Sequence, residues 1–248
     1  MTHKTFHQIL SKTHKWVGLL LGLQILAWTV GGVVMTWIPI DIVRGEHKIR
    51  KQPGSSLKIN PDFLGVNEVL RVAKQPVRML AYDTLLGQAI VRVHYQDGSN
   101  SVIDARTGKV LTPLNRELVG AIAAADFAPE APIEAITKLN EHTVDYRGPL
   151  PVWQVRFADS GSTSLYVSPD QARVVARRSA TWRLFDFFWM LHIMDYDERE
   201  DINNPLVMVF AALTALFALS GLGLIYYRFY RRDFDWLIGR RGDERRRD

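Results

Sequence analysis

Two long apolar runs lie near the two ends of the chain, and the first covers residues 16–40. Trp16 and Trp37 stand near its ends, and no charged residue lies between positions 17 and 38. A helix over those positions would rise about 33 Å, close to the hydrocarbon thickness of a bilayer. A signal peptide is the alternative, but the run is long for one and no Ala-x-Ala cleavage site follows it. We therefore predict an uncleaved transmembrane helix over 16–40.

The second apolar run covers residues 205–232, and it predicts a transmembrane helix over 205–228. This run ends in aromatic and basic residues of the kind that lie at a membrane interface. They are Tyr226, Tyr227, Arg228, Tyr230, Arg231 and Arg232.

Basic residues outside the two runs predict the orientation of the protein. Residues 1–15 precede the first run and residues 229–248 follow the second, and both segments are rich in lysine or arginine. Such residues stay on the cytoplasmic side of a membrane. We therefore expect a bacterial inner-membrane protein with two spans, both termini in the cytoplasm, and the segment 41–204 in the periplasm.

The region between the runs alternates helix-like and strand-like segments. A helix at 61–74 is followed by strands at 77–83, 88–98 and 100–112. A second helix at 118–142, with breaks at Pro129 and Pro132, is followed by strands at 152–159, 164–169 and 172–179. The repeated order predicts an α+β fold of two lobes, at 41–115 and 116–180, each a helix with an antiparallel sheet.

The composition narrows the function without identifying it. The 248-residue chain has a mean hydropathy of −0.06, which excludes a protein made mostly of membrane spans. It contains no cysteine, so disulfides, thiolate metal sites, covalent haem attachment and cysteine catalysis are excluded. The net charge of +5 comes largely from the two ends of the chain, which is a topology signal before it is a nucleic-acid signal. No G-x-S-x-G, H-E-x-x-H or phosphate-loop motif indicates a hydrolase.

Three stretches, in this order along the chain, resemble the PepSY domain and its associated membrane helices. They are HKWVGLLLGLQILAWTVGG (14–32), SVIDARTGKV (101–110) and WRLFDFFWMLHIMDY (182–196). The first looks like the opening span of that family, the second like its β-turn with an Asp ahead of Thr-Gly, and the third like its Leu-His element before the last span. The resemblance implies a membrane-anchored periplasmic protein of two PepSY-like lobes. Larger relatives have four spans, and some are implicated in ferric-siderophore reduction with b-type haem.

His14 stands one turn outside the first run, at the predicted cytoplasmic face. Gly18 lies one turn further on, and Gly32 lies along the same face of the helix. A small residue beside a histidine lets a flat macrocycle lie close to the backbone, so His14 is a candidate haem ligand. Gly18 and Gly22 also form a G-x-x-x-G pattern, which allows close helix packing. These glycines therefore have two interpretations, a haem-related role and helix packing alone.

Residues 181–204 read as an aromatic helix followed by an acidic linker. The helix is too short to span a membrane, and we expect it to lie along the periplasmic interface or to dip into it. Its aromatic face, from Trp182 to Tyr196, includes His192. That face is either an interfacial anchor or one wall of a haem pocket near the periplasmic surface. The acidic residues would mark the exit to water, as a solvated linker or as an attractant for cations and ferric complexes.

Two arrangements of axial ligands are open, because haem iron takes one or two histidines and the second run contains none. Within one chain, His47, just past the first run, would meet His192, just before the second. Between chains, two first helices packed through G-x-x-x-G would bring two copies of His14 together, in a homodimer or an equivalent heteromer. The candidate ligands of haem b are therefore His14, His47 and His192.

Two functions from different classes follow, and the sequence leaves open whether the protein is an enzyme. One is a b-type haem electron-transfer component, or a metal or ferric-siderophore reductase component, that serves iron uptake with a redox partner. The other is a non-enzymatic PepSY module that binds or regulates a periplasmic or membrane partner protein, because PepSY domains elsewhere are linked to protease inhibition. No feature of the sequence indicates a nucleic-acid partner.

Overall fold

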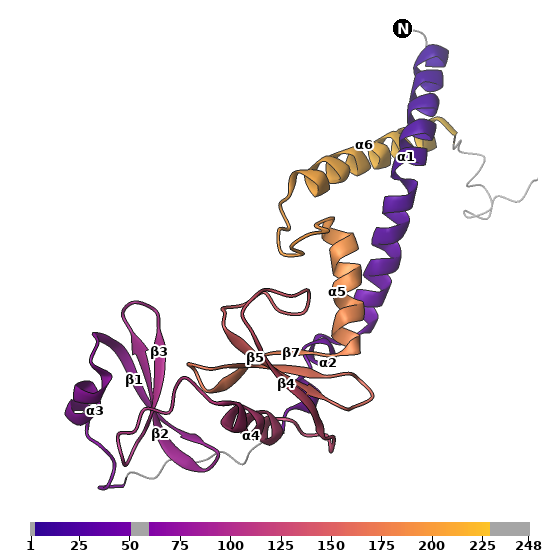
Figure 1. The fold of residues 1–248 in the computed structure, drawn as a ribbon. Helices are drawn as coiled ribbons and strands as arrows, with labels where there is room; N and C mark the ends of the chain where they lie inside the picture. Colours follow the sequence, from indigo (N-terminus) through magenta and orange to yellow (C-terminus); the bar gives the residue numbers. More distant parts are fainter. Residues whose placement is uncertain (1–2, 51–59, 229–248) are drawn as a thin grey trace, which may run out of the picture. The chain divides into compact units, whose positions relative to one another are not determined.

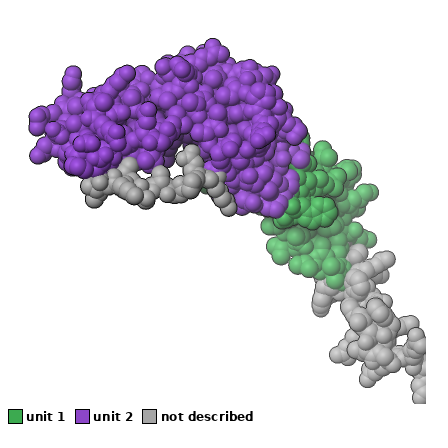
Figure 2. All heavy atoms as spheres, turned by 90° about the horizontal axis from the view of Figure 1, so that it is seen from below, with its two compact units in different colours: residues 1–37, 186–248 green, residues 38–185 purple. Residues whose placement is uncertain are grey.

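The computed structural model describes residues 3–50 and 60–228, in two compact units. One unit comprises residues 1–37 and 186–248, and the other comprises residues 38–185 (Figure 2). The predicted basic tail at 229–248 lies outside the described residues. The predicted α+β class is confirmed, because two apolar helices flank two antiparallel sheets along the chain (Figure 1).

The first lobe consists of helix α3 (Val66–Ala73) and a three-stranded antiparallel sheet of order β1–β2–β3. The strands are Val77–Leu85, Gln88–Tyr95 and Asn100–Asp104. Leu86 and Gly87 join β1 to β2 with positive φ at both positions, as a two-residue hairpin turn of type I′ requires. Helix α3 covers one face of the sheet, and their shared cluster contains Val69, Val91, Val93 and Ile103.

The turn after β3 shows what the Asp-x-x-Thr-Gly pattern does. Asp104 Oδ1 accepts hydrogen bonds from the backbone N–H groups of Arg106 (2.9 Å) and Thr107 (2.7 Å). Gly108 has φ 72°, and a Cβ atom there would lie 3.2 Å from Leu64 Cδ1. Both facts favour glycine at this position. The predicted turn is confirmed, and it ends β3 at Asp104, well before residue 112.

The second lobe consists of helix α4 (Arg116–Asp126) and a four-stranded antiparallel sheet of order β4–β5–β6–β7. The strands are Ile133–Leu139, Val152–Phe157, Ser164–Ser168 and Arg173–Arg178. Asn115 caps α4 by accepting a hydrogen bond from Leu118 N at 2.9 Å. Helix α4 lies close to β4, because a Cβ atom at Gly120 would be 3.0 Å from Ile136 Cδ1.

The predicted helix over 118–142 is wrong in its second half, where the structure has strand β4. Pro129 and Pro132 follow the end of α4 and do not continue a helix. The alternation of apolar and polar residues in β4 is broken by a register shift between Ile133 and Ala135. A strand interrupted in this way lacks the strict alternation that would predict it from the sequence.

The two lobes share a hydrophobic cluster in addition to the clusters that each lobe forms by itself. Ile90 and Val102 of the first sheet are buried in the same cluster as Phe127, Val155 and Leu165 of the second lobe. Each sheet therefore has a face in this cluster, which makes residues 38–185 a single unit.

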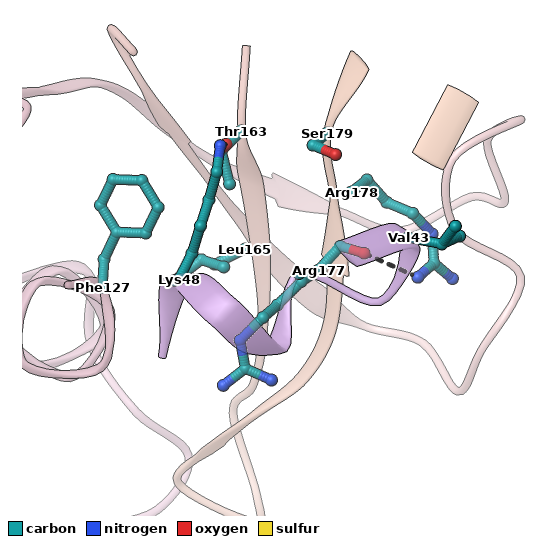
Figure 3. Close-up of a pocket in the computed structure, with 9 residues that line it drawn as sticks. Val43, Lys48, Phe127, Thr163, Leu165, Arg177, Arg178 and Ser179 are labelled. Atoms are coloured by element: carbon teal, nitrogen blue, oxygen red, sulfur yellow. Dashed lines mark hydrogen bonds between the residues drawn. The ribbon is translucent and has the colours of Figure 1, made fainter. Parts of the chain in front are cut away.

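The connecting segment after the first apolar helix packs on the second lobe, although the sequence assigned it to the first. It contains helix α2 (Ile40–Val43) and the 3₁₀ helix η1 (Glu46–Lys48). Ile49 pairs with Phe127 in an antiparallel bridge, and Ala128 N donates to Lys48 O at 2.8 Å. A cavity of about 10 Å³ remains beneath the segment (Figure 3). It has room for about one water molecule, so it is a packing junction and not a ligand site.

Lys48 fixes this segment to the lobe through a buried ion pair. Its Nζ donates to Asp159 Oδ2 (2.7 Å) and to Thr163 Oγ1 (2.8 Å). The exposed fractions of the Lys48 and Asp159 side chains are 18% and 9%. Burial by itself would raise the pKa of Asp159, but the hydrogen bonds from Lys48 and Thr163 outweigh it and lower that pKa from 3.8 to about 2.

Helices α1 (His3–Trp37) and α6 (Pro205–Arg228) contain the stretches that are long and apolar enough to cross a membrane. Those stretches are Gln8–Trp37 and Pro205–Ile225. Their large apolar side chains are mostly exposed, with fractions of 80% for Leu23 and 63% for Leu219. The core helix of a soluble protein would bury such side chains, so the exposure favours a lipid environment.

Helix α5 (Ala180–Ile193) ends beside the middle of α1. The last carbonyl groups of a helix have no partner within it, and lipid offers none. Here three side-chain amide or indole groups donate to them, which explains why a polar residue, Gln24, lies inside the apolar run. The hydrogen bonds are Gln24 Nε2 to Leu191 O (3.0 Å), Trp28 Nε1 to His192 O (2.9 Å) and Asn204 Nδ2 to Ile193 O (2.8 Å).

The Asp159 ion pair predicts a stability that depends on pH. The folded-state pKa of Asp159 is depressed, so its contribution is complete above about pH 4 and is lost as the pH falls from about 4 to about 2. We expect Asp159→Asn to lower the free energy of unfolding at pH 7 by about 2 kcal/mol, and to flatten the pH dependence in that window. Urea unfolding of the full chain in detergent, followed by near-ultraviolet circular dichroism, measures both effects.

Glu134→Gln is the matched control, because Glu134 pairs with Arg156 at 3.2 Å on the surface, with half of each side chain exposed. An exposed pair contributes less than about 1 kcal/mol. Equal destabilisation by the two substitutions would contradict the role given to the buried pair.

The contact between Gln24 and the end of α5 predicts local protection of that end. Gln24→Met keeps the length of the side chain but removes the donor to Leu191 O. We expect amide hydrogen exchange at residues 189–194 in lipid nanodiscs to become roughly 3- to 20-fold faster, the range for losing one interhelical hydrogen bond. Thr29→Val is the control, since Thr29 bonds only to Ile25 O of its own helix. Unchanged exchange in the Gln24 variant would show that this contact does not hold α5.

Candidate functional site

Helices α1 and α6 cross each other, with small residues at their contact (Figure 1). A Cβ atom at Gly18 would lie 2.7 Å from Phe217 Cε2, so no larger residue fits there without a shift. Further along, a Cβ atom at Gly223 would lie 3.2 Å from Leu10 Cδ2. Gly18 therefore serves the packing of α1 against α6 of its own chain, one of the two roles considered from the sequence.

His14 lies in this crossing, with its ring held on two sides. The imidazole stacks on the Phe217 ring, with centroids 4.2 Å apart and planes 8° from parallel. Its Nδ1 lies 2.7 Å from Ser220 Oγ. Gly221 leaves room for the ring edge, since a Cβ atom there would lie 3.2 Å from His14 Cε1. The sequence singled out His14, and the structure gives it a fixed orientation.

The hydrogen bonds around Ser220 assign the tautomer of His14. Ser220 Oγ also lies 2.7 Å from Phe217 O, and a carbonyl oxygen can only accept. The single hydroxyl proton of Ser220 is therefore donated to Phe217 O. The remaining bond requires His14 Nδ1–H to donate to Ser220 Oγ. In the neutral ring this leaves the lone pair on Nε2, which is the form of histidine that binds metals.

His192 lies in the last turn of α5, and its side chain is exposed. Its carbonyl is held by Trp28, whose ring lies 6.3 Å from the imidazole between centroids. Within the described residues, the ring itself has no hydrogen-bond partner. Helix α5 ends at Ile193 and Met194 has φ 54°, so the predicted aromatic face does not reach Tyr196.

His47 lies in η1, between Gly45 and Ile49, in the unit of residues 38–185. Its side chain is exposed. Among the described residues the imidazole makes no hydrogen bond or ring contact. Because His192 belongs to the other unit, the predicted pairing of His47 with His192 stays a prediction.

The linker after α5 is held by its own charged groups. Asp195 accepts hydrogen bonds from backbone N–H groups on both carboxylate oxygens, at 3.0 to 3.3 Å. The N–H groups of Asp201, Glu200, Glu198 and Asp197 lower the pKa of Asp195 despite some desolvation. Arg199 pairs with Asp186, and its carbonyl accepts from Trp189 Nε1 at 3.1 Å. Part of the acidic run is therefore structural and not only a solvated linker.

Within the unit of residues 1–37 and 186–248, the structure does not bring His14 and His192 together. His14 contacts α6, and His192 lies by Trp28, which is 14 residues further along α1, or about 21 Å of helix. In the part of the chain that the structure describes, no three His, Asp or Glu side chains form a group that could hold a metal ion. His14 and His192 are therefore separate candidate ligands on α1 and α5.

The sequence analysis missed the residues that position these histidines. Ser220 and Phe217 orient His14, while Trp28 and Gln24 hold the end of α5 that carries His192. The available signal was the presence of Gln24 and Ser220 within apolar helices, where a polar side chain usually has a partner.

Comparisons with known proteins agree with the arrangement of helices and lobes. A search of curated proteins and a search of solved structures each found no match. The sequence model of one family, described as the PepSY-associated TM region, matches residues 11–248. The match covers most of the first apolar helix, all of the second and everything between them. The chain therefore belongs to the PepSY-associated transmembrane family, and it is a membrane-associated PepSY protein.

Proposed function

We propose that this protein is a b-type haem electron-transfer or metal (ferric-siderophore) reductase component of a bacterial inner membrane. The observation that carries the proposal is the pair of hydrogen bonds at Ser220 Oγ, which engage His14 Nδ1 and leave the Nε2 lone pair of His14 available. A hydrogen bond from the other ring nitrogen to an oxygen is the usual support of a histidine that ligates a metal.

Each residue of this site has a separate task. Ser220 and Phe217 hold the His14 ring in one plane, and Gly18 lets α6 approach close enough to do so. When bound, haem b would supply a reversible one-electron couple of its iron. His14 and His192 are its proposed protein ligands on α1 and α5, and His47 is the proposed ligand from the connecting segment. A ferric complex would be the substrate in the reductase version of the proposal.

The oligomeric state follows from the number of ligands. Because His192 contacts α1 at Trp28, away from His14, we place a second protein ligand of His14's haem in another chain, in a homodimer or a heteromer. Gly18 already contacts Phe217, whereas a Cβ atom at Gly22 or Gly32 would meet nothing within 4 Å. We propose that a partner helix approaches α1 at Gly22 and Gly32 instead of using Gly18.

One observation favours a second candidate function, a non-enzymatic PepSY module that binds a partner protein. Within the unit of residues 1–37 and 186–248, His14 and His192 lie at separate places along α1, so this unit by itself does not pair them on one haem. In that case His192 is an interfacial anchor, and His14 is a packed polar residue of the helix crossing.

The first test is the visible absorption spectrum of the protein purified after expression with ample haem. We expect a b-type spectrum, haem loss on replacing His14 or His192 by Ala, and no loss for His142→Ala in the other unit. If both ligand variants kept the full haem complement with an unchanged spectrum, the ligand assignment would be wrong. A colourless wild-type protein would favour the partner-binding module.

Ser220→Ala gives a sharper version of this test, because it keeps His14 and removes only the acceptor of its Nδ1–H. We expect haem affinity to fall about 10- to 100-fold, the usual effect of losing such support. Thr214→Val, a substitution in the same helix that leaves His14 and its contacts in place, is the control. Equal haem affinity in the Ser220 variant and the wild type would show that the hydrogen bond from His14 to Ser220 does not support His14 as a haem ligand.

The proposed orientation places both termini in the cytoplasm and residues 41–204 in the periplasm. Alkaline phosphatase, which is active only in the periplasm, should be inactive when fused after Asp248 and active when fused at Gly98. Activity after Asp248 would overturn the orientation.

A further inference from the structure

A polar cleft of about 220 Å³ lies where the two lobes meet. Along β2, Ile90 is buried in the shared core, and Arg92 and His94 follow it on the same face at a spacing of two residues. The cleft is therefore the outward continuation of that core, where the facing side chains change from apolar to polar. Because the core joins the lobes, it also fixes the distance between the walls of the cleft.

On the wall from the first lobe, the two charged side chains, Asp83 and Arg92, form an ion pair with each other. Arg92 Nε donates to Asp83 Oδ2 at 2.7 Å, and its Nη1 donates to Gln171 O across the cleft. His94 Nδ1 lies 2.6 Å from Asn100 Oδ1. This wall therefore presents hydrogen-bonding groups without net charge.

The wall from the second lobe carries two opposite charges that form no ion pair with the described residues. Asp170 and Arg173 both line the cleft and are exposed. Among the described residues neither makes an ion pair, although they are three positions apart in one turn. Arg173 Nε donates to Gln171 Oε1 at 2.7 Å, which orients the guanidinium and leaves its two NH₂ groups available.

The turn that carries these charges is anchored in the protein. Ala172 has φ 49° and is 1% exposed, within the shared core. Leu114 N donates to Pro169 O at 2.9 Å, and Gln171 N donates to Ser168 Oγ at 3.2 Å. A carboxylate and a guanidinium are thus held on a fixed turn, facing a neutral polar wall.

We infer that this cleft binds a small zwitterion, a short peptide or an amino acid with both a free ammonium and a free carboxylate group. Asp170 pairs with the ammonium, Arg173 pairs with the carboxylate, and His94 and Asn100 bond to the polar groups between them. A simple anion or cation would leave one of the two charges of the turn unpaired. The inference is independent of haem, because it concerns only residues 38–185.

Three small ligands test the inference by isothermal titration calorimetry on the full chain in nanodiscs. Glycylglycine carries both charges, N-propionylglycine replaces the ammonium by a methyl group, and glycylglycinamide lacks the carboxylate. We expect saturable binding of glycylglycine and at least tenfold weaker binding of the other two, because each loses one charge-assisted contact. No saturable binding of glycylglycine below 10 mM, or equal binding of all three, would overturn the inference.

Two substitutions assign the contacts. In Asp170→Asn, glycylglycine and N-propionylglycine should bind equally, and in Arg173→Gln, glycylglycine and glycylglycinamide should bind equally. Arg173→Lys, which keeps the charge, should restore a preference for the carboxylate. Asp62→Asn and Arg116→Gln, outside the cleft, are matched controls and should leave all three affinities unchanged. If the cleft variants kept the wild-type preferences, the ligand would lie elsewhere and the assignment would fail.

Discussion

The membrane unit depends on one constraint, which is that a helix ending in apolar surroundings must find partners for its last carbonyl groups. Helix α5 ends beside the apolar run of α1, where neither its own backbone nor lipid supplies those partners. Gln24 and Trp28 supply two of them from α1, and Asn204 supplies the third from the start of α6. One set of contacts therefore fixes the end of α5, the position of His192 and the return of the chain into α6.

Small side chains complete the unit by letting α1 and α6 approach closely. Lipid gives no hydrophobic driving force between helices, so their contact rests on packing and on interhelical hydrogen bonds. Gly18 admits the Phe217 ring and Gly221 admits the edge of His14. The same close approach brings Ser220 to His14, and the one proton of a hydroxyl group then decides which ring nitrogen keeps its lone pair. The packing of α1 against α6 therefore also sets the hydrogen bonding of His14.

The sequence predicted the elements that rest on local pattern. Both apolar helices, the Thr107-Gly108 turn and the strands of the first sheet follow from run length, turn residues and alternation. Strand β4 was missed because a register shift breaks its alternation, and the shared core was missed because Ile90 contacts residues far along the chain. The surroundings of His14 could be predicted only in part. A histidine beside glycines is visible in the sequence, whereas its stacking on Phe217 depends on how two helices cross.

In the proposed haem site, the ligand set has to be completed without a histidine from α6. Helix α6 contains no histidine, and its Phe217 side chain already packs against α1 at Gly18. Two α1 helices that paired through Gly18 would compete with Phe217, which also orients His14. A partner that displaced α6 there would therefore remove the contacts that orient His14, the proposed ligand. The open positions, Gly22 and Gly32, avoid this conflict, because a helix docked on them leaves the His14 crossing intact. The geometry of the crossing thus favours a partner that adds a ligand without replacing α6.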